Sequence, residues 1–223
     1  MRKIMEELPE EIVTVPAGRV RLEGNLVIPE EAKGIVLFAH GSGSSRHSIR
    51  NRYVAGALRE GALATLLFDL LSAEEETIDL ETTHLRFDIA LLSERLMHSI
   101  DWITENEKTK HLRIGLFGSS TGAGAALVAA AQRPELIGAV VSRGGRPDLA
   151  SSALNAVEAP TLLIVGGNDS SVMELNRQAL AQLHCEKKME IVPRATHLFE
   201  EPGALEEVAG LARDWFQTHL AMT

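Results

Sequence analysis

The 223-residue sequence is poor in cysteine, in aromatic side chains and in positive charge. Its single cysteine, Cys185, excludes a disulfide framework or a cysteine-based zinc site within one chain, and it favours a cytoplasmic location. Aromatic residues make up only 4% of the chain, which disfavours a large apolar substrate tunnel. The formal net charge is −9, so nucleic acid is not an expected partner, because phosphate binding needs a basic surface.

The sequence also lacks long apolar runs. No stretch reaches the roughly 18 consecutive apolar residues of a membrane span. The charged N-terminus, MRKIMEELPEE, contains no hydrophobic signal core, so neither a membrane anchor nor a secretory signal is expected. A hydrophobic share of 45% without linkers or repeats predicts one domain over residues 1–223.

Short apolar runs alternate with helix-forming segments from Gly34 to the end of the chain. This alternation predicts an α/β fold with a mostly parallel, doubly wound sheet. Two earlier strands around the turn residues Pro16-Ala17-Gly18 predict an antiparallel hairpin at one edge. The expected strands cover 11–15, 19–28, 34–39, 64–70, 112–117, 137–141, 160–165 and 188–192, and the expected helices include 48–60, 83–106, 172–183 and 204–219.

Two segments between these elements bear on access to a site. The acidic segment 72–81 is expected to be a surface loop. Only residues 143–159 separate two core strands after the central helix, which is too short for a helical cap domain. We therefore expect an open, shallow pocket that suits small or short-acyl substrates.

The stretch LRIGLFGSSTGAGAALVAA, residues 112–130, combines a strand, a tight turn and an Ala-rich helix. The turn Gly118-Ser119-Ser120-Thr121-Gly122 has the G-x-S-x-G pattern of a nucleophile elbow. The glycines let strand and helix approach closely, and the helix N-terminus behind Ser120 favours developing negative charge. The alternative is a small-residue turn without chemistry.

Two further side chains follow later strands and complete a predicted triad. The chain order Ser120, Asp169, His197 is that of the α/β-hydrolases, and the carboxyl ends of parallel strands meet at one edge of the sheet. Ser120 would attack a carbonyl, His197 would transfer the proton and Asp169 would orient the imidazole. Asp169 could instead cap the following helix, and Asp148 is the competing acid.

Tetrahedral intermediates need two aimed N–H donors. The backbone N–H of Thr121 is one expected donor. The other is expected from the loop after strand 34–39, at Ser42 or, as the next choice, Gly43. His40, next to Gly41, is expected to shape this turn without transferring protons.

Arginines crowd the predicted rim of the site. Arg143, Arg46 and Arg50 are candidates for substrate binding, because a guanidinium can hold a substrate carboxylate through paired hydrogen bonds. The alternative is that they pair with the protein's own acidic side chains. No metal site and no cofactor are expected.

The blocks HGSGSSRHS, GLFGSSTGAGAAL, VVSRGGRPDL, APTLLIVGGND and ATHLFEEPG resemble the α/β-hydrolase superfamily, and within it the small dienelactone-hydrolase-like proteins. The resemblance covers nearly the whole chain and implies the triad Ser120, Asp169 and His197 with oxyanion donors at Ser42 and Thr121. One departure is that dienelactone hydrolases use a cysteine nucleophile where this chain has serine.

The expected function is therefore that of a serine carboxylesterase acting on small esters or lactones. The expected partner is a small-molecule substrate, and a homodimer is compatible with the sequence. Two alternatives are a nucleotide-binding Rossmann-like protein and a catalytically silent hydrolase fold used for binding. The first is disfavoured because a third glycine after Gly41 and Gly43 would fall at Arg46.

Overall fold

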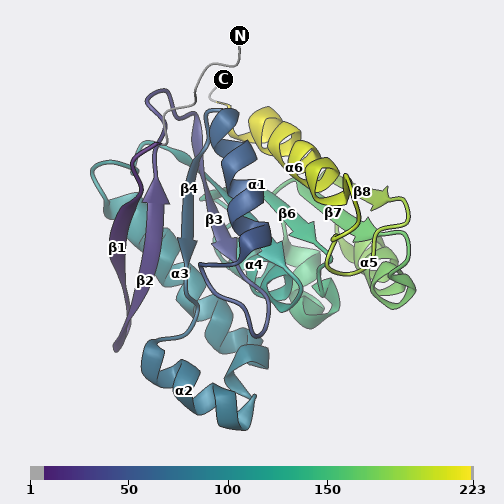
Figure 1. The fold of residues 1–223 in the computed structure, drawn as a ribbon, viewed down its shortest axis with the longest axis horizontal. Coiled ribbons are helices and arrows are strands. Elements are labelled where there is room, and N and C mark those ends of the chain that lie inside the picture. Colours follow the sequence, from purple (N-terminus) through teal and green to yellow (C-terminus); the bar gives the residue numbers. More distant parts are fainter. Residues whose placement is uncertain (1–7, 222–223) are drawn as a thin grey trace.

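The computed structural model describes residues 8–221 and contains an eight-stranded sheet with helices on both faces (Figure 1). The strand order is β1-β2-β4-β3-β5-β6-β7-β8. Every neighbouring pair is parallel except β1 with β2 and β2 with β4. The predicted α/β fold with an antiparallel hairpin at one edge is confirmed. The strands are β1 (Glu11–Ala17), β2 (Val20–Val27), β3 (Gly34–Ala39), β4 (Ala64–Phe68), β5 (Arg113–Ser119), β6 (Ile137–Arg143), β7 (Thr161–Gly166) and β8 (Lys187–Val192).

Two apolar cores lie on opposite faces of this sheet. Successive strand residues point to opposite faces, so Val36 and Phe38 belong to one core and Ile35 and Leu37 to the other. Helices α1 and α6 cover the first core, and α3, α4 and α5 cover the second (Figure 1). The bounds are α1 (Ile49–Glu60), α3 (Ile89–Glu105), α4 (Thr121–Gln132), α5 (Ser170–Gln182) and α6 (Ala204–Leu220).

The acidic segment after β4 is a helix, α2 (Ala73–Thr82), so the prediction of a surface loop there was wrong. Ser72 caps this helix in a capping box with Glu75, and three glutamates in the first turn complement the helix dipole. Only Asp79 of this helix is buried, and the hydrophobic periodicity that usually indicates a helix is therefore missing. The helix projects from the body of the protein beyond the carboxyl ends of β3 and β4 (Figure 1).

The helix expected over 83–106 starts later than its sequence pattern suggests. Thr83 ends α2 in a left-handed conformation with φ 57°, a short 3₁₀ turn η1 (Leu85–Phe87) follows, and Asp88 caps α3. Between β6 and β7 there is only the 3₁₀ segment η2 (Pro147–Ala156), so no cap domain is built at that point.

Strand β5 and helix α4 meet at a turn without room for extra atoms. A Cβ at Gly118 would lie 2.4 Å from the Ala123 Cα, and one at Gly122 would lie 2.2 Å from the Ala39 carbonyl oxygen. Both neighbours are backbone atoms, which cannot rotate away. The close approach of α4 to β3 and β5 therefore requires glycine at these two positions.

Gly122→Ala should lower the free energy of unfolding by about 2 kcal/mol, because the added methyl group forces the backbone apart. Gly210→Ala is a matched control, since no atom lies within 4 Å of a Cβ at this position of α6. The control should gain about 0.5–1 kcal/mol from higher helix propensity. Urea unfolding followed by circular dichroism measures both, and equal stabilities for the two variants would contradict the close packing of the elbow.

Candidate active site

Ser120 occupies a strained backbone position between β5 and α4, with φ 50° and ψ −121°. Such a conformation costs about 1–3 kcal/mol in a residue other than glycine, so the surroundings must hold it. The Ser120 N–H donates to the Arg143 carbonyl at 3.3 Å, and the Ser120 carbonyl accepts from the N–H groups of Arg146 at 3.0 Å and Ala123 at 3.1 Å. These three hydrogen bonds fix the turn predicted as a nucleophile elbow.

Asp169 and His197 lie side by side after β7 and β8. The His197 Nδ1 and the Asp169 Oδ2 are 2.7 Å apart, and the side chains are 39% and 10% exposed. An ionised carboxylate only accepts hydrogen bonds, so a neutral imidazole in this position would carry its proton on Nδ1 and leave Nε2 as the acceptor. Asp148, the competing acid, instead holds Arg146 through two hydrogen bonds of 2.8 and 2.7 Å.

Ser120 and His197 both border the backbone where β6 ends. The Arg143 carbonyl accepts from Ser120, and a Cβ at the next residue, Gly144, would lie 3.5 Å from the His197 Nδ1. No hydrogen bond joins the Ser120 hydroxyl to His197 in the described part of the chain. Catalytic hydrogen bonds often tighten only when substrate is bound. The structure thus brings the three predicted residues to one edge of the sheet and places His197 against Asp169.

The loop after β3 packs against the elbow. A Cβ at Gly41 would lie 3.0 Å from the Ser120 Cβ, and the Ser42 N–H donates to the Thr121 hydroxyl at 2.9 Å. The predicted donor at Ser42 is therefore next to Ser120 but engaged by a side chain. Gly43, the second choice, has φ 67°, a conformation that suits glycine.

His40 links this loop to the segment after β4. Its Nε2 accepts from the Leu70 N–H at 3.1 Å, and its Nδ1 donates to the Gly41 carbonyl at 3.0 Å. Burial lowers the pKa of His40, so the ring is neutral and these two hydrogen bonds are compatible with one tautomer. This geometry agrees with a shaping role for His40.

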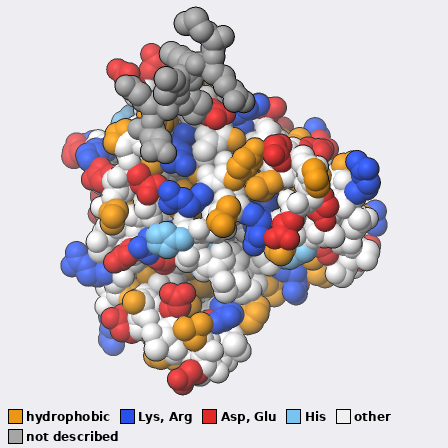
Figure 2. All heavy atoms as spheres, in the orientation of Figure 1, with side chains coloured by type: hydrophobic (Ala, Val, Ile, Leu, Met, Phe, Trp, Pro, Cys, Tyr) orange, Lys and Arg blue, Asp and Glu red, His pale blue; other side chains and the backbone are white. Residues whose placement is uncertain are grey.

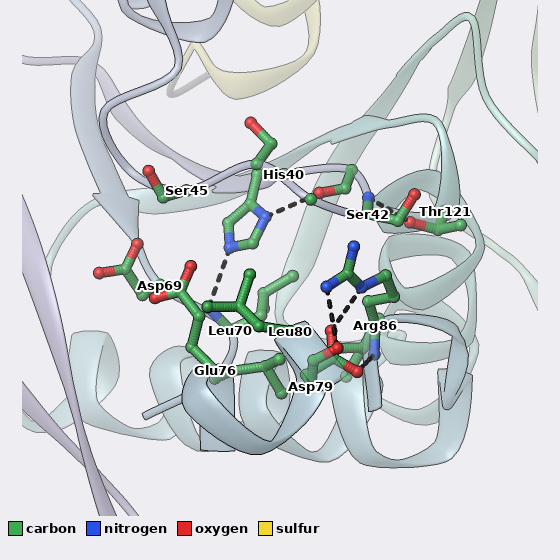
Figure 3. Close-up of a pocket in the computed structure, with 15 residues that line it drawn as sticks. His40, Ser42, Ser45, Asp69, Leu70, Glu76, Asp79, Leu80, Arg86 and Thr121 are labelled. Carbon is green, nitrogen blue, oxygen red and sulfur yellow. Dashed lines mark hydrogen bonds and ion pairs between the residues drawn. The ribbon is translucent and has the colours of Figure 1, made fainter. Parts of the chain in front are cut away.

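A cavity of about 180 Å³ opens beside the elbow (Figure 3). The loop after β3 and Thr121 form one wall, and α2 with η1 forms another. Its lining combines leucines with polar and charged groups, namely His40, Ser42, Asp69, Leu70, Leu71, Glu76, Asp79, Leu80, Arg86, Leu92 and Thr121 among others. The helix that the sequence analysis missed is therefore part of the pocket.

The three arginines predicted to bind substrate lie outside this lining. Arg46 forms ion pairs with Asp69 and Glu23, and Arg50 pairs with Glu200 at 3.0 Å. Their role in substrate binding stays a prediction.

Arg143 is a different case, since it is only 7% exposed and its Nε and Nη1 have no hydrogen-bond partner among the described residues. Its guanidinium lies 5.9 Å from the centre of the Phe199 ring. Burial, with a smaller contribution from nearby Arg50, lowers the pKa of Arg143 to about 10.

The arginine that does line the pocket is Arg86, which the sequence analysis did not single out. It lies in η1, and Asp79 of α2 binds its guanidinium. The spacing D-x₆-R carries no recognisable signal, because the contact depends on how α2 ends.

Residues 8–221 contain no candidate metal site and no membrane-spanning helix. No group of three or more His, Cys, Asp or Glu side chains there could hold a metal ion. None of the helices in this span has the length and apolar character to cross a lipid bilayer. On the face shown in Figure 2, acidic and basic side chains are interspersed.

Arg143→Met should raise the free energy of unfolding at neutral pH. The folded state lowers the pKa of Arg143 to about 10, so the buried charge opposes folding at lower pH, and this opposition fades as the pH rises through that value. Arg177→Met is a matched control on an exposed face, expected to change stability by less than about 0.5 kcal/mol. Thermal unfolding measures both, and a clear loss of stability in Arg143→Met alone would contradict an unpaired buried charge.

Comparison with known proteins gives a consistent family. The model of the Dienelactone hydrolase family matches residues 22–221. A crystal structure of a dienelactone hydrolase from Anabaena variabilis ATCC 29413 is 63% identical, with a TM-score of 0.95, covering 96% of this chain and 100% of that chain. Est1E from Butyrivibrio proteoclasticus shares the fold with a TM-score of 0.78 at 15% identity, over 93% of this chain and 98% of Est1E.

A longer relative carries a different name. The Mycobacterium tuberculosis (strain H37Rv) protein named "Putative phosphoribosyl transferase Rv0571c" is 57% identical over 213 residues, which are 96% of this chain and 47% of that protein. The chain thus spans about half the length of this relative. With the family model matched over residues 22–221 and a solved member 63% identical, the chain belongs to the dienelactone hydrolase family.

Proposed function

We propose that the protein is a serine hydrolase that cleaves small carboxylic esters or lactones through an acyl-enzyme on Ser120. The observation that carries this proposal is the His197–Asp169 pair, 2.7 Å apart, at the sheet edge where the strained Ser120 lies. Membership of the dienelactone hydrolase family supports hydrolysis as the class of reaction. A serine at the elbow in place of cysteine favours general ester chemistry.

The residues divide the reaction between them. The Ser120 hydroxyl oxygen attacks the ester carbonyl carbon while the His197 Nε2 takes its proton, and a tetrahedral oxyanion forms. The C–O bond to the alcohol then breaks as His197 returns the proton to the leaving oxygen. A water molecule, deprotonated by His197, attacks the acyl-enzyme in the second half, and Ser120 is released. Asp169 holds the imidazole in the required tautomer throughout.

The oxyanion would be held by the Thr121 N–H and by the loop after β3. Thr121 is the first residue of α4, so its N–H is not used within the helix and lies at the positive end of the helix dipole. Ser42 can serve as the second donor once its hydrogen bond to the Thr121 hydroxyl is exchanged for the oxyanion. Gly43 is the alternative donor.

The name of the M. tuberculosis relative describes a protein about twice as long as the matched segment. The segment shared with this chain is the one that the dienelactone hydrolase model matches. We therefore assign hydrolysis, and not phosphoribosyl transfer, to this chain.

A panel of p-nitrophenyl esters of graded acyl length tests the reaction. Activity should be highest on acetate or butyrate and fall with longer chains, because the cavity holds only about 180 Å³. Ser120→Ala should abolish turnover. Wild-type protein that cleaves none of the esters would indicate a catalytically silent fold, and turnover that survives in Ser120→Ala would place the nucleophile elsewhere.

Asp169→Asn should reduce kcat by a factor on the order of 10⁴, because the amide supports the wrong imidazole tautomer. Asp148→Asn is the matched control, since this acid pairs with Arg146 and should leave most of the activity. Steady-state kinetics on p-nitrophenyl acetate compares the two. A larger loss in Asp148→Asn than in Asp169→Asn would reverse the assignment of the acid.

A further inference from the structure

Arg86 presents one edge of its guanidinium to the loop that follows β3. Its Nε contacts the Asp79 carboxylate and its Nη2 donates to the Asp79 carbonyl at 3.0 Å. The remaining nitrogen, Nη1, would lie 3.5 Å from a Cβ at Gly43 and makes no hydrogen bond within residues 8–221. Figure 3 shows the guanidinium between Asp79 and Ser42, inside the pocket. Asp79 thus holds Arg86 in place, and Nη1 is the nitrogen left to donate to a ligand.

Asp79 holds the Arg86 side chain in this position. The residue is 2% exposed, and its Oδ1 accepts from the N–H groups of Leu85 at 2.7 Å and Arg86 at 3.1 Å. Burial alone would raise the pKa of Asp79, but the hydrogen bonds from Arg86 and Leu85 lower it overall. Asp79 is therefore ionised, and the Asp79–Arg86 pair has no net charge.

Glu76 adds a negative charge to the lining of the pocket. Asp69 and Glu76 line it together with Asp79. Arg46 neutralises Asp69, whereas Glu76 has no ion pair in the described part of the chain. A carboxylate on a ligand would meet an arginine already compensated and a like charge nearby, whereas a neutral oxygen would meet only the free donor.

The pocket reaches the proposed reaction centre at Ser42 and Thr121, the two expected oxyanion donors. His197 must reach the leaving oxygen, and it does not line this pocket. The pocket is instead bordered by Ser42 and Thr121, which lie on the oxyanion side. We infer from this that the group entering the pocket is the one that stays bonded to the carbonyl carbon.

We propose that Arg86, positioned by Asp79, determines acyl specificity by donating from Nη1 to a neutral oxygen of the acyl group. The substrate class is short esters or lactones whose acyl part carries an oxo, hydroxy or ether oxygen and no carboxylate. Leu80 and Leu92 cover its hydrocarbon part. The inference rests on the proposed function and refines it, since it disfavours the substrate carboxylate that the sequence left as one of two alternatives.

Three methyl esters with acyl groups of similar size test this inference: methyl pentanoate, methyl 4-oxopentanoate and monomethyl succinate. Methanol release at neutral pH measures kcat/KM for each ester without a chromogenic group. The kcat/KM of the wild-type protein should be about tenfold higher for the oxo ester than for the pentanoate, because one charge-assisted hydrogen bond contributes an effect of about this size. Monomethyl succinate should be the poorest of the three.

Two variants separate hydrogen bonding from charge. Arg86→Met should lower kcat/KM for the oxo ester by about tenfold and change methyl pentanoate by less than about twofold. Glu76→Gln should raise kcat/KM for monomethyl succinate by about threefold, because it removes a like charge. Glu81→Gln is the matched control, an exposed residue of the same helix that does not line the pocket, and it should leave all three values unchanged.

The outcomes separate this inference from the proposed function. Ser120-dependent turnover with equal rates on the three esters, or a preference for monomethyl succinate, would overturn the role of Arg86 and leave the esterase intact. Loss of all three activities to the same extent in Arg86→Met, with Glu76→Gln also without effect, would likewise overturn it. Wild-type protein inactive on all three esters and on the p-nitrophenyl panel would overturn both.

Discussion

Backbone hydrogen bonds from Ala123 and from the segment 143–148, at the end of β6, hold Ser120 in a conformation that the serine would not adopt alone. Its N–H and carbonyl are both engaged, by Arg143 and by Arg146 and Ala123 respectively. The same segment borders His197 at Gly144 and carries the Arg146–Asp148 pair. One short loop therefore positions the proposed nucleophile and restricts the choice of acid. The strain at Ser120 is maintained by the parallel pairing of β5 with β6, which brings this loop into reach.

The specificity that we propose for the site depends on a different part of the chain. Helix α2 and η1 project beyond the sheet and close one side of the pocket, and their conformation depends on Ser72 and on buried Asp79. Asp79 acts twice, because it caps the N–H groups of η1 and compensates the charge of Arg86. A helix with little apolar burial is thus stabilised by polar contacts that also define the pocket. In this proposal the residues that carry out the reaction lie at the sheet edge, and the residues that select the substrate lie in α2 and η1.

The sequence was sufficient for the fold because apolar strands and helices alternate along it and because turn residues mark most boundaries. It also placed Ser120, Asp169 and His197 after strands, and in the structure they follow β5, β7 and β8. It favoured Asp169 over Asp148, but the contact that engages Asp148, with Arg146, is seen only in the structure. Helix α2 was not predicted, because its only buried residue is polar. The spacing of Ser72 and Glu75, which form a capping box, was the one sequence signal for this helix. Arg86 was beyond sequence reasoning, because its approach to Gly43 joins segments far apart in the chain.

Detection of the covalent intermediate tests the central claim most directly. Wild-type protein mixed with p-nitrophenyl butyrate, quenched with acid during turnover and digested should yield a peptide containing Ser120 that is heavier by one butyryl group. The modification should be absent from Ser120→Ala. Rapid ester turnover without any acylated peptide, or with the acyl group on another residue, would contradict a serine nucleophile at this elbow.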